Sequence, residues 1–115
     1  MENRRIETQR LMLRPITQED APAVFAWASD PEVNRYMPYP LHKSIEDTRA
    51  WIASITPDML EFGFCRKDSG QLIGTGGVGK NEEGVHTLGY NLRHDAWGYG
   101  YATEAAQAML AWAYH

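Results

Sequence analysis

The sequence lacks most features that mark secreted, membrane-spanning and nucleic-acid-binding proteins. Its 115 residues contain one cysteine, Cys65, which excludes an internal disulfide and predicts a reducing, cytoplasmic location. No apolar run approaches the roughly 20 residues that cross a bilayer, and residues 1–10 have no apolar signal-peptide segment, so no membrane association is expected. The net charge of −4 disfavours a nucleic-acid partner, because phosphate backbones bind basic surfaces.

Signs of a metal centre or a reactive thiol are also missing. The histidines, at positions 42, 86, 94 and 115, show no metal-ligand spacing, so no metal site is predicted. Cys65 lies in the alternating run EFGFCRK, which favours packing within a strand over a nucleophilic role. The length and the ordinary composition, 43% hydrophobic and 23% charged, predict one globular domain over residues 1–115.

The N-terminal half contains one predicted strand followed by helices. Residues 7–16 alternate around Leu11 and Leu13, which predicts a strand. Residues 17–28 begin with a capping-box pattern at Thr17 and continue with helical apolar spacing. Asp30 before a proline predicts a short second helix, and residues 44–57 a further helix after a proline-rich loop.

The C-terminal half changes to a period of two and then returns to a helix. Residues 60–67 and 71–79 predict a hairpin closed by a turn at 68–70, and residues 85–92 a third strand after a turn at 81–84. A loop over residues 95–100 opens onto a helix that runs to the chain end. The predicted order, β-α-α-β-β-β-α, is that of an α+β domain with a mixed, mainly antiparallel sheet flanked by helices.

Two glycine patterns are candidates for a phosphate-binding loop. Residues 74–79, GTGGVG, match the spacing G-x-G-x-x-G, but a turn follows them where a dinucleotide-binding loop would open a helix. We therefore interpret these glycines as part of a hairpin strand with a bulge or a close packing contact.

The second pattern has the context that the first lacks. Gly98 and Gly100 lie between a predicted strand and the start of a helix, in the run DAWGYGYATEAAQAML. Helix N-termini carry unpaired N–H groups and the positive end of the helix dipole, so this loop can bind a pyrophosphate without basic side chains. From these residues alone, a simple tight turn between strand and helix is an equally good interpretation.

The run WGYGYATEA at residues 97–105 resembles the acetyl-CoA loop of the GNAT family of N-acetyltransferases. The resemblance extends to ETQRLMLRPITQEDAPAVFAW, DPEVNRYMP, GTGGV and LGYNL, and is strongest to the RimJ/RimL branch, which acetylates ribosomal-protein N-termini. The implied family pattern is Q/R-x-x-G-x-G/A. Both glycines match this pattern, whereas Asp95 replaces the first Gln or Arg and Tyr99 stands where lysine is frequent.

The resemblance implies transfer of the acetyl group of acetyl-CoA to a primary amine, such as a protein N-terminus, by direct attack. The implied acceptor pocket is formed around Tyr36, Met37, Pro38 and Tyr39. The strand before the loop would pair with the pantetheine arm and polarise the thioester carbonyl. The implied cofactor-binding residues are Tyr90, Asn91, Leu92, Trp97, Gly98, Tyr99, Gly100, Tyr101, Ala102 and Thr103.

Family members of this kind continue with a further strand, a helix and a closing hairpin, so the chain resembles the N-terminal two-thirds of an acetyltransferase. We expect an exposed sheet edge that promotes homo-oligomers. A non-catalytic acyl-CoA-binding module, or an inactive fragment, is the alternative to an enzyme. A protein that binds a different diphosphate is a third hypothesis, which the absence of a Walker lysine disfavours.

Candidates for the catalytic base are few. Histidine ordinarily titrates near neutral pH, which makes His86 a candidate base, while Glu82 and Glu83 are better explained as turn charges. Glu104 lies in the first helical turn, where a carboxylate complements the dipole. The tryptophans at positions 27, 51 and 112 are interpreted as core or interface residues.

Overall fold

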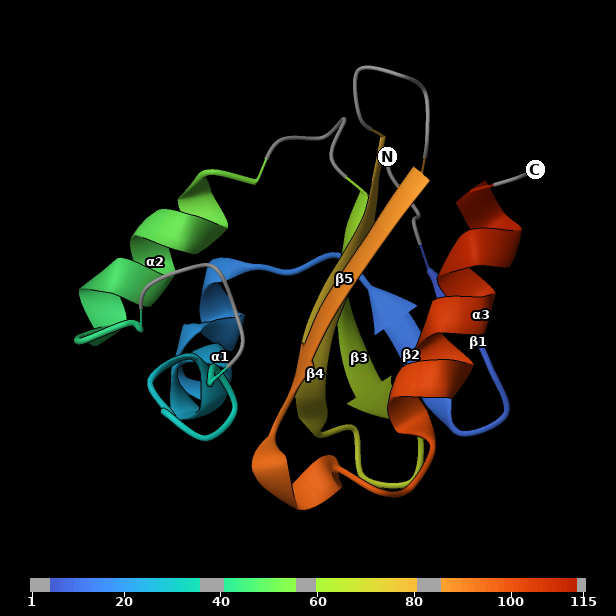
Figure 1. Cartoon of the computed structure of the whole chain (residues 1–115), viewed down its shortest axis with the longest axis horizontal. Coiled ribbons are helices and arrows are strands. Elements are labelled where there is room, and N and C mark those ends of the chain that lie inside the picture. The colour runs from blue at the N-terminus through green and yellow to red at the C-terminus, as the bar shows by residue number, and fades with distance from the viewer. Residues whose placement is uncertain (1–4, 36–40, 56–59, 81–85, 114–115) are drawn as a thin grey trace.

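The structure, a computed structural model, describes residues 5–35, 41–55, 60–80 and 86–113, without the side chains of residues 60, 80, 86–88 and 113. Its centre is a five-stranded sheet in which every neighbouring pair is antiparallel (Figure 1). The strands follow one another in chain order: β1 (Ile6–Glu7), β2 (Leu11–Arg14), β3 (Leu60–Arg66), β4 (Leu72–Lys80) and β5 (His86–Leu92).

Helices cover both faces of this sheet. One face is covered by α1 (Ala21–Ala28), with α2 (Ile45–Ala53) beside it, and the other by α3 (Tyr101–Ala113) (Figure 1). The short 3-10 turns η1 (Gln18–Asp20) and η2 (His94–Ala96) precede α1 and α3. The arrangement confirms the predicted fold class, an antiparallel sheet flanked by helices.

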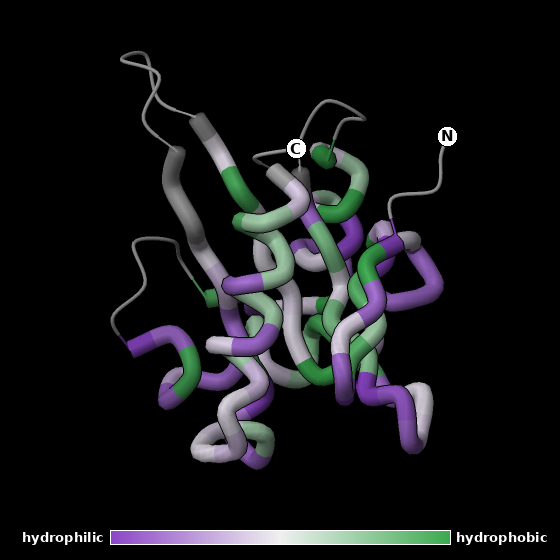
Figure 2. The backbone as a smooth tube through the Cα atoms, turned by 90° about the vertical axis from the view of Figure 1, so that its right-hand side faces the viewer, coloured by the Kyte–Doolittle hydropathy of each residue, from purple (hydrophilic) through white to green (hydrophobic). Residues whose placement is uncertain are grey.

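The two sheet faces carry separate hydrophobic cores. Phe62 and Phe64 of β3 point to the α3 face, where they pack with residues of β2 and α3 and are fully buried. Cys65 points to the α1 face and packs with Trp27 and Leu72, which confirms its packing role; burial raises the pKa of its thiol. In Figure 2 the hydrophilic segments lie mainly at the periphery of the molecule. Among the described residues, no helix is both long and apolar enough to span a bilayer.

The strand predicted over residues 7–16 is confirmed at β2, around Leu11 and Leu13, but a turn after Glu7 breaks its first half. Thr8 causes the break: its N–H donates to the Leu11 carbonyl (2.8 Å), and its hydroxyl accepts the Leu11 N–H (2.9 Å). A threonine side chain that bonds to nearby backbone groups competes with the strand ladder. The second strand ends at Arg14, ahead of the capping box that the sequence predicted at Thr17.

The capping box is extended by a buried ion pair. Asp20 accepts the N–H of Thr17 (2.8 Å) and forms a two-pronged contact with the Arg14 guanidinium (2.8 and 2.9 Å). Although burial opposes ionisation, Arg14 and Thr17 together hold the pKa of the Asp20 carboxyl below its usual range. Asp20 is 8% exposed, so this pair fixes the start of α1 to the end of β2.

The short helix predicted to begin at Asp30 and Pro31 is not formed. Residues 31–35 form turns, because the Asp30 carboxylate accepts the N–H of Glu32 (2.9 Å), which is a local turn bond. The Asn34 side chain then donates to the carbonyls of Trp27 (2.8 Å) and Asp30 (2.9 Å) and closes the end of α1.

Gly74 and Gly76, in the run at residues 74–79, serve packing, as the sequence predicted. A Cβ atom at Gly74 would lie 2.5 Å from the Asn91 carbonyl oxygen, and one at Gly76 would lie 2.6 Å from the Phe64 ring. The register between β3 and β4 shifts at Phe64/Cys65, a β-bulge that leaves Ile73 without a partner on β3. Glycine is therefore required where the strand passes close to its neighbours.

Candidate functional site

The loop between β5 and α3 depends on two glycines in the left-handed region. Gly98 has a φ of +85° and Gly100 a φ of +81°, conformations that strain residues with a Cβ. A Cβ at Gly98 would meet nothing within 4 Å among the described atoms, so backbone conformation alone demands glycine there. The two residues turn the chain from the sheet edge directly into α3, which begins at Tyr101.

Unpaired amides gather at this turn. The first helical bond of α3 runs from the Glu104 N–H to the Gly100 carbonyl (3.0 Å). Within the described part of the chain, the N–H groups of residues 98–103 have no hydrogen-bond acceptor. Such amides, at the positive end of a thirteen-residue helix, form a site for an anion.

Contacts from the N-terminal turn hold the loop in place. The Glu104 carboxylate accepts the Arg10 N–H and Nε–H (2.7 Å each) and the Thr8 hydroxyl. Burial opposes ionisation of Glu104, but Thr8 and Arg10 together hold its pKa below the usual range. Arg10 also donates from Nη1 to the Tyr99 carbonyl (2.8 Å), which fixes the residue between the two glycines. These bonds give Glu104 a positioning role beyond the dipole effect that the sequence predicted.

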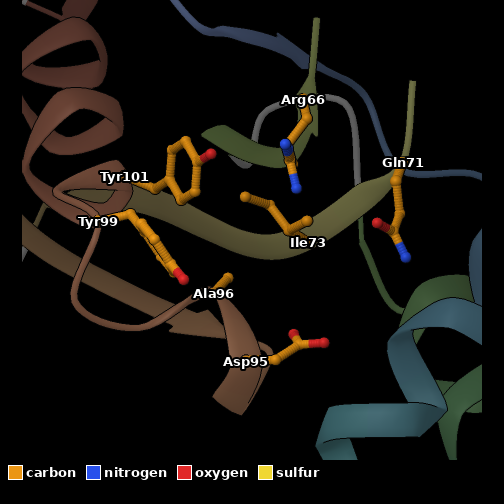
Figure 3. Close-up of a pocket in the computed structure, with 7 residues that line it drawn as sticks. All are labelled: Arg66, Gln71, Ile73, Asp95, Ala96, Tyr99 and Tyr101. Carbon is orange, nitrogen blue, oxygen red and sulfur yellow. The ribbon is translucent and has the colours of Figure 1, made fainter. Parts of the chain in front are cut away.

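A cavity of about 220 Å³ lies beside the loop (Figure 3). Tyr99 and Tyr101 line it from the loop and α3, and Arg66 and Gln71 from the β3–β4 hairpin (Figure 3). The Arg10 guanidinium carbon lies 4.6 Å from the Tyr101 ring centroid. Nε of Arg66 is the one buried side-chain donor without a partner in the described regions. Asp95 also lines the cavity, so the flank of the loop carries aromatic rings and charges of both signs beside the amides.

The strand before the loop offers main-chain groups along an open edge. The Arg93 N–H bonds to the Ile73 carbonyl of β4 (2.8 Å), and the carbonyls of Gly89 and Asn91 also point to β4. Because main-chain groups alternate in direction along a strand, those of Tyr90 and Leu92 point away from β4. The Trp97 indole N–H donates a hydrogen bond to the Leu92 carbonyl (3.1 Å). Among the described strands, none pairs with this edge of β5.

The side chain of Asn91 contacts the turn that follows α1. The Asn91 side-chain N–H donates to the side-chain oxygen Oδ1 of Asn34 (3.3 Å), so the turn after α1 contacts β5. The predicted acceptor residues Tyr36, Met37, Pro38 and Tyr39 follow this turn but lie outside the described residues. The structure therefore places Asn34, which precedes the predicted acceptor residues in the sequence, beside the predicted donor strand.

The predicted donor residues come together, whereas the predicted bases are not described. Residues 90–92 lie at the end of β5, and residues 97–103 form the loop and the start of α3, with η2 between the two segments. His86 begins β5, but its side chain lies outside the description, as do Glu82 and Glu83. In the described residues, no cluster of three or more histidine, cysteine, aspartate or glutamate side chains could hold a metal ion.

Sequence reasoning missed the most unusual carboxyl group. Glu61 lies on β3, within a covered sheet, and burial raises its pKa from 4.5 to about 7. Its neighbours in the run LEFGFCR are otherwise apolar on both faces until Arg66. A charged residue within such a strand is the signal that could have identified it.

Comparisons with known proteins agree with this geometry. The family model described as the acetyltransferase (GNAT) domain matches residues 10–115. An uncharacterised N-acetyltransferase of Bacillus licheniformis, p20, is 34% identical over 110 residues, covering 90% of this chain and 62% of the relative. A second, YoaA of Bacillus subtilis, is 32% identical, covering 95% of this chain and 66% of the relative.

Solved structures share the fold. The chain is similar to a GNAT-family acetyltransferase of Bacillus anthracis, with a TM-score of 0.86 and 28% identity over 96% of this chain and 66% of that one. An acetyltransferase of Agrobacterium tumefaciens has a TM-score of 0.77 and 25% identity over 100% of this chain and 69% of that one.

The chain therefore belongs to the GNAT acetyltransferase family. It spans 62% to 66% of the length of the two curated relatives described above.

Proposed function

We propose that this chain takes part in the transfer of an acetyl group from acetyl-CoA to a primary amine. The observation that carries the proposal is the run of unpaired amides at residues 98–103, directly after an open strand edge. The amides suit a pyrophosphate and the edge suits an extended pantetheine arm, because an added strand pairs with free N–H and C=O groups. Bound acetyl-CoA would supply the thioester that the amine attacks.

Each part of the donor site has a separate task. Gly98 and Gly100 shape the amide run, and Arg10 holds the Tyr99 carbonyl so that the loop is set before a ligand arrives. The outward N–H groups of Tyr90 and Leu92 are the candidates for polarising the thioester carbonyl, whose oxygen gains negative charge during attack. Asn91, whose main-chain carbonyl faces β4, would instead support the acceptor side through Asn34.

The acceptor class follows from chemistry at neutral pH. An α-amino group titrates at about 7.7–8.0 and a lysine amine at about 10.4, so a protein N-terminus needs far less help to lose its proton. A protein N-terminal amine is therefore the first acceptor that we propose. Direct attack by this amine needs no covalent enzyme intermediate, and it needs a group that removes one proton. The RimJ/RimL resemblance points to the same acceptor class.

Isothermal titration calorimetry tests the donor site. We expect binding of acetyl-CoA and CoA, and no binding of ATP or NAD at comparable concentrations. Glu46→Gln is the control and should bind acetyl-CoA like the wild type, because Glu46 is an exposed residue of α2 outside the proposed donor site. Binding of ATP without binding of CoA would refute the proposed function.

A further inference from the structure

The Trp97 side chain lies where the open edge of β5 meets the glycine loop. Trp97 directly precedes Gly98, and its indole N–H donates to the Leu92 carbonyl (3.1 Å). Its main-chain N–H donates to the His94 carbonyl (3.2 Å), so this amide is already used and does not join the unpaired run at residues 98–103. Any role of Trp97 toward a ligand therefore falls to its side chain.

The indole bond limits what the edge of β5 offers to a ligand. The Leu92 carbonyl points away from β4, so an added strand would use it as an acceptor. Because Trp97 already donates to this carbonyl, the described groups that stay open near the loop are the Leu92 N–H and the N–H and carbonyl of Tyr90. A strand-like ligand can pair along β5 as far as the Leu92 N–H, and pairing ends there.

The indole is held on more than one side. Its ring meets the His94 ring edge to face, with centroids 4.6 Å apart and planes at 75°, a favourable arrangement of aromatic rings. The turn η2 beneath it is closed by the Ala96 N–H, which donates to the Arg93 carbonyl (2.9 Å). Trp97 is nevertheless 42% exposed, so part of its side chain remains open to a ligand.

The proposed path of the donor passes this side chain. The amides proposed for the pyrophosphate, at residues 98–103, follow Trp97 in the chain, and the edge proposed for the pantetheine arm, at residues 90–92, precedes it. Tyr90 on that edge is also left 44% exposed. Tryptophan and tyrosine combine an apolar body with one polar group, which suits an arm of alternating methylene and amide groups.

We propose that Trp97 is a positioning residue of the donor site, whose indole holds the Leu92 carbonyl and thereby fixes the register of the pantetheine arm on β5. This inference rests on the proposed function. With the carbonyl held, the arm cannot shift along the edge toward the loop, because a shifted register would need the Leu92 carbonyl as an acceptor. The thioester is thereby kept at one position along the strand.

One variant and one matched control test the inference. Trp97→Phe keeps an aromatic ring beside His94 and removes the N–H that Leu92 accepts. Trp112→Phe makes the same change on α3, where the Trp112 ring contacts Phe62 (centroids 5.8 Å apart) and lies outside the proposed donor site. The probes are acetyl-CoA and S-acetylpantetheine, which carries the arm without the pyrophosphate.

We expect Trp97→Phe to lower acetyl-CoA affinity about tenfold in calorimetry, the order of effect of one lost hydrogen bond. S-acetylpantetheine, followed by NMR titration, should bind the variant no more weakly than the wild type, because an arm without the pyrophosphate is free to use the released carbonyl. Trp112→Phe should match the wild type with both probes, and both variants should unfold cooperatively.

NMR separates a positioning role from a general loss of structure. In the wild type, saturating acetyl-CoA should shift the Trp97 indole N–H resonance without speeding its exchange with water, because the bond to Leu92 is kept. The ¹³C resonance of the Leu92 carbonyl should respond to S-acetylpantetheine in Trp97→Phe and not in the wild type. A residue that only stabilised the loop would not produce this difference.

Other results overturn the inference. Wild-type acetyl-CoA affinity in Trp97→Phe, an equal loss in Trp112→Phe, or an equal loss of both probes excludes a register role. So does a Trp97 indole resonance in the wild type that ignores acetyl-CoA or exchanges faster in the complex, a measurement that does not depend on how the variant folds. Failure of the proposed function differs, because wild-type protein would then not bind acetyl-CoA in calorimetry, whatever residue 97 is.

Discussion

The partly buried carboxyl of Glu61 predicts an unusual dependence of stability on pH. At pH values well below 4.5 the group is protonated in both the folded and the unfolded chain, so it adds no pH dependence. As pH rises above 4.5 the unfolded chain releases this proton, while the folded chain holds it until about pH 7. The group therefore lowers the free energy of unfolding as pH rises between these values. Above about pH 7 this loss of stability no longer grows.

The size of this effect follows from the two pKa values. The rise from 4.5 to about 7 corresponds to about 3 kcal/mol at full ionisation, because each pKa unit is worth about 1.4 kcal/mol. Between pH 5 and pH 8 the penalty grows by about 2.5 kcal/mol. Glu61→Gln removes the ionisation, so its stability relative to wild type should increase by this amount over that range.

Urea denaturation of the two proteins at pH 5, 6, 7 and 8 measures the difference. Other groups titrate equally in both proteins, so their contributions cancel in the difference. Glu46→Gln should give a flat difference over the same range, because Glu46 is exposed. A flat difference for Glu61→Gln as well would show that the carboxyl is solvated and would refute the reasoning.

Three further predictions concern the frame around the site. Asp20→Asn should lower the free energy of unfolding by about 2 kcal/mol in urea denaturation, because Arg14 loses its carboxylate partner; an unchanged midpoint would contradict this. Gly98→Ala should cost about 1–2 kcal/mol through its positive φ and weaken acetyl-CoA binding in calorimetry, and full affinity would show that the loop tolerates another conformation. Gly76→Ala should lower the melting temperature, because its methyl would lie 2.6 Å from a ring carbon, whereas Gly89→Ala should not; equal effects would argue against the strand packing described above.

Much of the fold could be predicted from the sequence because the apolar periodicity is unambiguous where segments are long. The hairpin of β3 and β4, the strand β5 and the helix α3 follow directly from alternation and from the 3.6-residue period. The errors fall on short segments, where side chains bond to their own backbone. Thr8 breaks a strand and Asp30 forms a turn in place of a helix, and both effects depend on local hydrogen bonds that a hydrophobic pattern does not encode.

The candidate site could be predicted only in part, for a similar reason. Gly98 and Gly100 identify the loop, because two glycines between a strand and a helix carry a clear conformational meaning. The Arg10 contacts and the Glu61 environment arise from tertiary packing. Glu61 becomes unusual only once β4 and β5 are aligned beside it in register, and residue spacing along one strand does not reveal such an alignment.

The Glu104 contacts have a consequence for how this molecule acquires its site. They join Thr8 and Arg10 to a residue more than 90 positions later in the chain. Contacts so distant in sequence carry a high loop-closure entropy and form late unless other structure has already brought the ends together. The loop that we assign to the donor therefore reaches its final shape only after the sheet has assembled. An extension or deletion within the first ten residues should therefore change the conformation of the loop that contains Gly98 and Gly100, although the two segments are far apart in the sequence.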